Sequence, residues 1–70
     1  MDPFKQLDTV ALLVDRPEFR LVSGQVGTIV EQLDENAYEV EFADKKGRTL
    51  ASLPIESKDL MLLHFETVGS

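Results

Sequence analysis

Apolar and polar positions in the segment 23–42 predict two short β-strands joined by a polar turn. The second strand contains a strict alternation of apolar residues and glutamates: Tyr38, Glu39, Val40, Glu41 and Phe42. Because successive side chains of a strand point to opposite faces, the three apolar residues share one face and the two glutamates share the other. The pattern therefore predicts a hairpin with one core face and one acidic, solvated face.

The same reasoning predicts five short strands along the chain. We expect them at residues 9–14, 26–33, 38–43, 48–53 and 60–65. Tight turns are predicted at residues 34–36 and 44–47, which contain the Asp, Asn and Gly residues that favour such turns. Gly27 lies inside the second predicted strand, where a glycine indicates a bulge, a bend or a close backbone approach.

The remaining connections complete the predicted fold. Residues 15–25 form a long first loop, from which we expect Phe19 and Leu21 to pack over the core. Pro54 is expected to end the fourth strand, and residues 54–59 to form a single short helical turn. Five short strands with a long first loop and a turn before the last strand are typical of a small SH3-like barrel. We therefore predict an all-β, five-stranded SH3-like barrel.

One domain spanning residues 1–70 is the expected organisation. The core is predicted over residues 7–65, followed by a loose tail over residues 66–70. Hydrophobic residues make up 43% of the chain and charged residues 29%, which is ordinary for a globular protein and too apolar for a disordered one.

Cysteine usage and net charge indicate the cellular location and the kinds of partner to expect. The chain has no cysteine, which excludes disulfides and thiolate metal sites and predicts a cytoplasmic location. No segment approaches the roughly 20 apolar residues of a membrane span, and no signal-peptide pattern opens the chain. The net charge of -6 repels nucleic acids and anionic membranes and attracts a basic protein partner.

Two segments of the sequence resemble known families. The segment SGQVGTIVEQL resembles the glycine-spaced hairpin of the KOW type, which is found in ribosomal and transcription-elongation proteins. A longer resemblance, over roughly residues 7–63, includes the segments LDTVALLVDRPEF, GQVGTIVE, AYEVEFAD, GRTLASLPI and DLMLL. In these segments the chain is similar to the bacterial family called domain of unknown function 4926, which is common in cyanobacteria. That resemblance implies an SH3-like barrel and no particular activity.

A more distant resemblance concerns a subunit of a larger assembly. The chain is similar in its expected fold to the SH3-like peripheral subunit of the photosynthetic NADH-dehydrogenase-like complex. That subunit docks on other subunits and faces an electron carrier. The resemblance implies a peripheral position in a photosynthetic or redox complex as an alternative role.

Residues that usually carry catalysis or hold metals are sparse. His64 is the single histidine, and a metal site would have to combine it with carboxylates such as Asp8 or Glu66. Glu39 and Glu41 share one solvated face, whereas acid-base catalysis needs two carboxyl groups in unlike environments. We therefore predict no enzyme activity, no catalytic residues, no metal and no cofactor.

Two charged clusters are candidate binding surfaces. Six acidic residues and no basic residue lie between Glu31 and Asp44, and this face would either keep the domain soluble or bind a basic partner. The acidic candidates are Glu31, Glu35, Glu39 and Glu41. A small basic tip, which residues of the first loop could approach in a barrel, would instead bind phosphates in a nucleic acid. The basic candidates are Lys45, Lys46, Arg48 and Arg16.

The last predicted strand, residues 60–65, is apolar on both faces. One face would pack on the core, and the other needs a cover from the first loop, from Phe4 and Leu7, from a partner protein or from a second copy in a homodimer. The interface residues would then be Met61, Leu63 and Phe65.

Our leading hypothesis is a non-enzymatic module that binds another protein. It would dock through the apolar last strand, the long first loop or the acidic hairpin, and it could act as a neutralising, antitoxin-like or immunity-like partner of a basic protein. The alternatives are a KOW-like RNA or ribosome accessory protein and a peripheral subunit of a larger complex.

Overall fold

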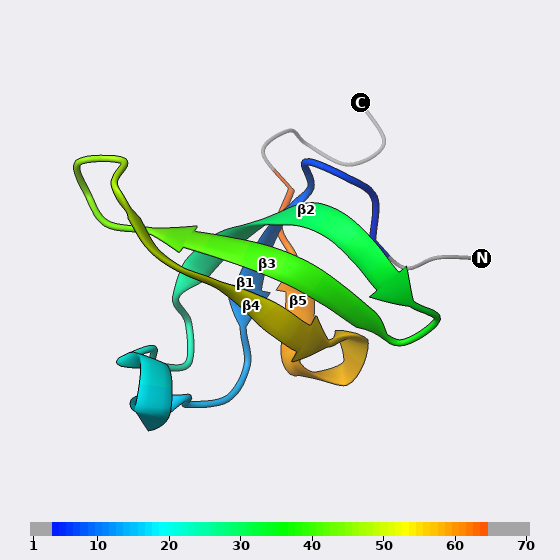
Figure 1. Ribbon diagram of the computed structural model, residues 1–70, viewed down its shortest axis with the longest axis horizontal. Coiled ribbons are helices and arrows are strands. Elements are labelled where there is room, and N and C mark those ends of the chain that lie inside the picture. Colours follow the sequence, from blue (N-terminus) through cyan, green and yellow to red (C-terminus); the bar gives the residue numbers. More distant parts are fainter. Residues whose placement is uncertain (1–3, 65–70) are drawn as a thin grey trace.

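Two tight turns organise the middle of the chain into an antiparallel meander. The computed structural model describes residues 4–64, and the meander consists of β2 (Val26–Asp34), β3 (Ala37–Ala43) and β4 (Thr49–Glu56) (Figure 1). Asp34 Oδ1 closes the first turn by accepting a hydrogen bond from the backbone N–H of Asn36 at 2.8 Å. Gly47 adopts a φ of +80° in the second turn, a conformation that favours glycine. Both turns lie where the sequence predicts them.

Strands β1 (Thr9–Leu12) and β5 (Leu60–Leu62) complete the sheet. The strand order is β4-β3-β2-β1-β5, and every neighbouring pair is antiparallel. Short 3₁₀ turns, η1 (Pro17–Phe19) and η2 (Ser57–Asp59), lie in the first loop and before β5. The all-β fold, its five strands and the helical turn before the last strand are confirmed, while η1 is an addition. Between residues 4 and 64 the chain has no helix with the length and apolar character that crossing a membrane requires.

The sheet is not closed into a barrel. Within the described residues β4 pairs with β3 and β5 pairs with β1, and no ladder joins β4 to β5. Figure 1 shows β2 and β3 curving across β1 and β5. The predicted closure is therefore wrong: the sheet curves over its own core, but its two edge strands do not meet.

Side chains from all five strands meet in one core. Tyr38, Val40 and Phe42 are completely buried, which confirms the predicted core face of β3. Phe4 lies before the predicted start of the core at residue 7, yet its ring is buried against Tyr38. The other buried apolar side chains of the core are Val10, Leu12, Leu21, Ile29, Leu53, Ile55 and Leu60.

The ends of three strands differ from the prediction. Pro54 does not end β4, because β4 is an edge strand and a proline nitrogen can face away from the neighbouring strand without losing a ladder bond. Strand β1 ends at Leu12, although the backbone N–H of Leu13 still donates to the Asp59 carbonyl in the register of the β1–β5 ladder. Strand β5 ends at Leu62, and Phe65 lies outside the described residues.

Of the two side chains of the first loop that were predicted to pack on the core, only one does so. Leu21 is buried, as expected. Phe19 is 43% exposed, so the prediction that it packs over the core is wrong. The guanidinium carbon of Arg16 lies 5.4 Å from the centre of the Phe19 ring, and this cation–π contact holds the ring at the surface.

Gly27 marks a close approach between β2 and β3. A β-carbon built on Gly27 would lie 2.7 Å from Val40 Cγ1, nearer than real side chains come. Side chains of Val40 and Phe42 make this close approach, and not the backbone approach that the sequence predicts. The bulges of β2 lie farther along the strand, where the pairing with β3 shifts between Ile29 and Glu31 and again between Gln32 and Asp34.

Candidate functional site

A row of apolar residues crosses the outer face of the sheet. Ala11 on β1 pairs with Val26 on β2 and with Met61 on β5. Directly paired residues of antiparallel strands project from the same face, and the opposite face carries the buried side chains of Val10 and Leu12. Val26 and Met61 are each 49% exposed at the two ends of the row, whereas Ala11 between them is buried. We call Val26, Ala11 and Met61 the outer apolar row.

Two leucines enlarge this apolar surface. Leu13 lies two residues beyond Ala11, and Leu63 lies two residues beyond Met61, so the pleat directs them toward the same outer side. Leu13 is exposed and Leu63 is half-buried. The outer side of β1 and β5 is therefore apolar beyond the row itself.

Neither segment that could cover the last strand from within the chain does so fully. The ring of Phe4 packs inside the core, and Leu7 is 73% exposed. The first loop leaves Met61 half exposed. Of the three predicted interface residues on the last strand, Met61 and Leu63 lie on the partly exposed face, and Phe65 lies outside the described residues.

The acidic side chains of the hairpin lie on the same outer face as the apolar row. Thr28, two residues from Val26, pairs with Glu41 on β3. Glu39 lies two residues from Glu41 and pairs with Glu31 of β2. Three of the four predicted acidic residues are thus on one face, because the strand pleat and the register place them there.

A hydrogen bond to Glu39 and the position of Glu35 complete the description of the acidic side chains. Ser52 on β4 donates a hydrogen bond from its hydroxyl to Glu39 Oε2 at 2.8 Å, which fixes that carboxylate over β3 and β4. Glu35, the fourth predicted acidic residue, is exposed in the turn between β2 and β3. The outer face therefore changes from apolar over β1 and β5 to acidic over β2 and β3.

The predicted basic tip is built around an aspartate. Asp44 accepts hydrogen bonds from the backbone N–H groups of Lys46 at 2.8 Å and Arg48 at 3.0 Å, and from Arg48 Nε at 2.8 Å. The Arg48 backbone N–H, above all, holds the pKa of the Asp44 carboxyl below its ordinary value, against the opposing effect of desolvation. Lys45 and Lys46 are exposed, while the guanidinium of Arg48 already has a carboxylate partner.

Arg16 is not part of the basic tip. Its Nε atom lies 3.0 Å from Glu18 Oε2 in the first loop. The backbone N–H of Glu18, and next the Arg16 guanidinium, lower the pKa of the Glu18 carboxyl. Figure 1 shows the loop containing η1 and the loop between β3 and β4 projecting from the sheet in different directions. The four predicted basic residues therefore do not form one surface.

His64 is exposed at the end of the described chain. Within residues 4–64, no group of three or more histidine, aspartate or glutamate side chains lies close enough to hold a metal ion. Glu66, which the sequence offered as a partner for His64, lies outside the described residues.

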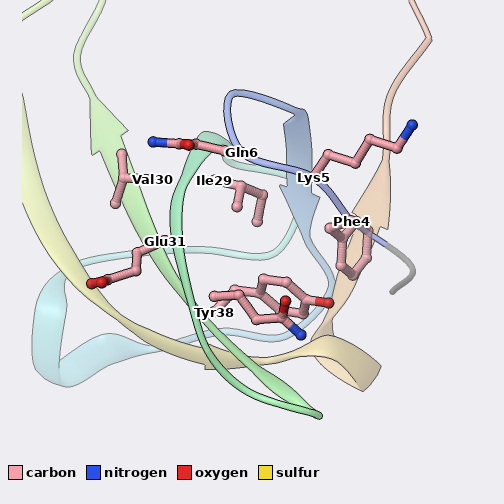
Figure 2. A pocket seen from close by; sticks show the side chains of 8 residues that line it. Phe4, Lys5, Gln6, Ile29, Val30, Glu31 and Tyr38 are labelled. Carbon is pink, nitrogen blue, oxygen red and sulfur yellow. The ribbon is translucent and has the colours of Figure 1, made fainter. Parts of the chain in front are cut away.

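A hollow beside β2 is a feature that the sequence pattern did not indicate. It has a volume of about 760 Å³ and lies between the segment 4–6 and the bulged part of β2, with Tyr38 as part of its wall (Figure 2). The side chains that line it are Phe4, Lys5, Gln6, Ile29, Val30, Glu31, Gln32 and Tyr38. No local motif could have revealed the hollow, because its walls come from three segments that only the folded chain brings together.

Comparison with protein families assigns the chain. The family model described as Domain of unknown function (DUF4926) matches residues 6–62. The chain belongs to the DUF4926 family. This match confirms the family resemblance stated from the sequence.

The DUF4926 match covers all five strands and therefore the whole outer apolar row. Leu63 and Phe4 lie just outside its limits. No curated protein matches the chain, and no solved structure does.

Proposed function

We propose that this DUF4926 protein is a non-enzymatic module that binds a basic protein through the outer face of its sheet. The observation that carries this proposal is the outer apolar row, which spans three strands and exposes about half of each end residue. Carboxylates of β2 and β3 lie on the same face. A partner surface with an apolar centre and basic side chains at one margin would complement both parts.

The two parts of the face have different physical roles. Burial of the apolar row removes hydrocarbon surface from water and supplies binding free energy, at roughly 25 cal/mol per Å² before the losses of association are subtracted. The carboxylates contribute mainly to the rate and orientation of encounter, and salt weakens that contribution. We therefore expect apolar substitutions to change dissociation and charge substitutions to change association.

A basic partner is favoured over a second copy of the chain. A two-fold dimer presents the same surface from both copies, so the carboxylates of Glu39 and Glu41 in one copy would enter the interface together with those of the other. The net charge of -6 adds to this repulsion. A partner of opposite charge converts the same carboxylates into an attractive contribution.

A neutralising role, as in an antitoxin or immunity protein, is one specific form of this proposal. A cytoplasmic location is part of it, and the lack of cysteine favours that location. The RNA-binding alternative is less favoured, because Arg16 and Arg48 already face carboxylates. No described feature favours a photosynthetic or redox complex over any other protein partner.

The experiment compares three forms of the full chain as baits in the native cell. Wild type, Met61→Lys and the control Leu33→Lys are tagged, purified with their partners and analysed by mass spectrometry. Leu33 is exposed to a similar degree as Met61 but lies at the far end of β2. We expect a basic protein in stoichiometric amount with wild type and Leu33→Lys, and its loss with Met61→Lys.

The partner is then purified and titrated by calorimetry. We expect Met61→Lys to weaken binding by tenfold or more, and Glu39→Gln with Glu41→Gln to slow association at low salt. Recovery of no stoichiometric partner, or equal binding by wild type and Met61→Lys, would refute the proposal. A wild-type dimer in sedimentation that Met61→Lys dissociates would replace the basic partner with a second copy.

A further inference from the structure

The hollow lies beside the part of β2 that follows its pairing with β1, which ends at Thr28, and no residue of the outer apolar row lines it. Ile29 and Tyr38, which form part of its wall, belong to the buried face of β2 and β3. Figure 2 shows Phe4 and Tyr38 facing each other, with Ile29 near them and the polar ends of Lys5 and Glu31 directed away on opposite sides. The hollow thus combines apolar and aromatic walls with polar ones. Its apolar and aromatic lining residues are Phe4, Ile29, Val30 and Tyr38, and its polar ones are Lys5, Gln6, Glu31 and Gln32.

Tyr38 carries a polar atom without a hydrogen-bond partner. The residue is completely buried, and its hydroxyl oxygen neither donates nor accepts a hydrogen bond. Nearly all buried polar groups in proteins are paired, and leaving one unpaired costs roughly 1–3 kcal/mol. An unpaired hydroxyl in the wall of a hollow therefore calls for a partner that reaches it from the hollow.

Phe4 is the side chain that such a partner would have to move. Its ring meets the Tyr38 ring edge to face, with 5.3 Å between the ring centres and an angle of 90° between their planes. The backbone around it is held separately, because Leu7 N donates to the Ile29 carbonyl at 2.7 Å and Lys5 N donates to Asp8 Oδ2 at 2.8 Å. These hydrogen bonds hold the segment through groups other than the Phe4 ring.

The backbone at Leu7 shows that this segment is held under strain. Leu7 has a φ of +74°, in the left-handed region that a leucine seldom adopts, and its side chain is largely exposed. Such conformations cost of the order of 1–3 kcal/mol and are concentrated at binding sites and clamps. Leu7 does not line the hollow itself, but it directly follows the segment 4–6 that does.

We propose that the hollow binds a small neutral aromatic molecule whose oxygen atom accepts a hydrogen bond from the Tyr38 hydroxyl. A flat ring can make the contact with Tyr38 that Phe4 now makes, and the volume is in the range of roughly 300–1,000 Å³ that is usual for small-molecule sites. A neutral molecule fits because the two charged side chains at the margin have opposite signs. The proposal does not rest on the docking function, since no residue of the outer apolar row lines the hollow, although Glu31 belongs to both surfaces.

The experiment titrates the full ¹⁵N-labelled chain with p-cresol and, separately, with toluene, which has the same ring and methyl group but no oxygen. We expect saturable shifts in the amide resonances of residues 4–6, 29–32 and 38. A neutral hydrogen bond contributes roughly 0.5–1.5 kcal/mol, which corresponds to roughly 2- to 12-fold tighter binding of p-cresol than of toluene.

Two variants make the test specific. In Tyr38→Phe, which keeps the ring and loses the hydroxyl, p-cresol and toluene are expected to bind equally. In Met61→Lys, p-cresol binding is expected to equal that of wild type. The proposal is overturned if p-cresol causes no saturable shift in those resonances, if wild type binds p-cresol and toluene equally, or if the preference survives in Tyr38→Phe. None of these outcomes depends on the partner of the outer face.

Discussion

Gly27 lies directly opposite Phe42, and a β-carbon on Gly27 would stand 2.8 Å from Cε1 of the Phe42 ring. Gly27→Ala therefore forces a methyl group into space that the core already fills. Since overpacking of this kind costs roughly 1–3 kcal/mol, we expect a loss of that size in the free energy of unfolding. Urea denaturation followed by circular dichroism measures it.

A double-mutant cycle separates this overlap from a simple backbone effect. Val40→Ala removes the Cγ1 atom that would lie 2.7 Å from the new β-carbon. We expect Gly27→Ala to be less destabilising in the Val40→Ala background than in wild type. Equal losses in the two backgrounds would contradict Val40 Cγ1 as the obstacle and leave the Phe42 ring as the cause.

Tyr38→Phe tests whether the buried hydroxyl stabilises the fold. Because that hydroxyl has no partner, its removal is expected to leave the free energy of unfolding unchanged or to raise it by up to roughly 3 kcal/mol. Tyr38→Ala, which also removes the ring, is expected to lower it by roughly 3–5 kcal/mol. Thermal and urea unfolding of both variants give the comparison, and a clear destabilisation by Tyr38→Phe would mean that the hydroxyl is paired.

Asp44 gives the second hairpin a dependence on pH. Its pKa is lower in the folded protein, chiefly because the ionised carboxylate accepts the Arg48 backbone N–H. Its contribution to stability is therefore complete above the unfolded-state pKa and is lost as the pH falls through the lower folded-state pKa. We expect Asp44→Asn to be less stable than wild type at neutral pH and the difference to shrink toward about pH 2.

Two measurements check this expectation. The pH dependence of the Asp44 carboxyl carbon shift in nuclear magnetic resonance gives the folded-state pKa directly. Urea unfolding of wild type and Asp44→Asn across the same range gives the stability difference. A folded-state pKa at or above the ordinary aspartate value, or a difference that grows toward acid pH, would contradict the role of the turn hydrogen bonds.

Adjacent residues on β5 should respond oppositely to substitution. Met61 projects from the outer face, so Met61→Lys is expected to change the free energy of unfolding by less than roughly 0.5 kcal/mol. Leu60 is buried, and Leu60→Ala is expected to lower it by roughly 2–5 kcal/mol. Chemical denaturation of both variants is sufficient, and a large loss in Met61→Lys would show that Met61 is part of the core.

The local sequence pattern was sufficient to predict a strand and its buried face where one face is apolar and the other polar. Tyr38, Val40 and Phe42 alternate with glutamates, and one side of β3 is buried along its whole length, so the period of two settles both the strand and its orientation. Phe19 shows the limit of the same reasoning, because an aromatic side chain can also be held at the surface by a neighbour such as Arg16.

Features that depend on distant pairing could not be read from local signals. Pro54 signals a strand end in isolation, but its effect depends on whether β4 is an edge strand. Closure of the barrel depends on whether β4 pairs with β5. The sequence of a short segment does not reveal such a pairing. In the candidate site, Met61 and Leu63 could be predicted, because the sequence of the last strand is apolar on both faces. Val26 and Ala11 could not, because only the register of three strands places them beside Met61.

The pairing of β1 with β5 has a consequence for how the protein folds. Hairpin partners in β2, β3 and β4 are close in sequence, while the ladder from Val10–Leu62 to Leu12–Leu60 joins segments from the two ends of the described chain. Long-range pairing requires a large loop to close before any contact is gained. The meander is therefore expected to form first, and the meeting of β1 with β5 to set the overall folding rate.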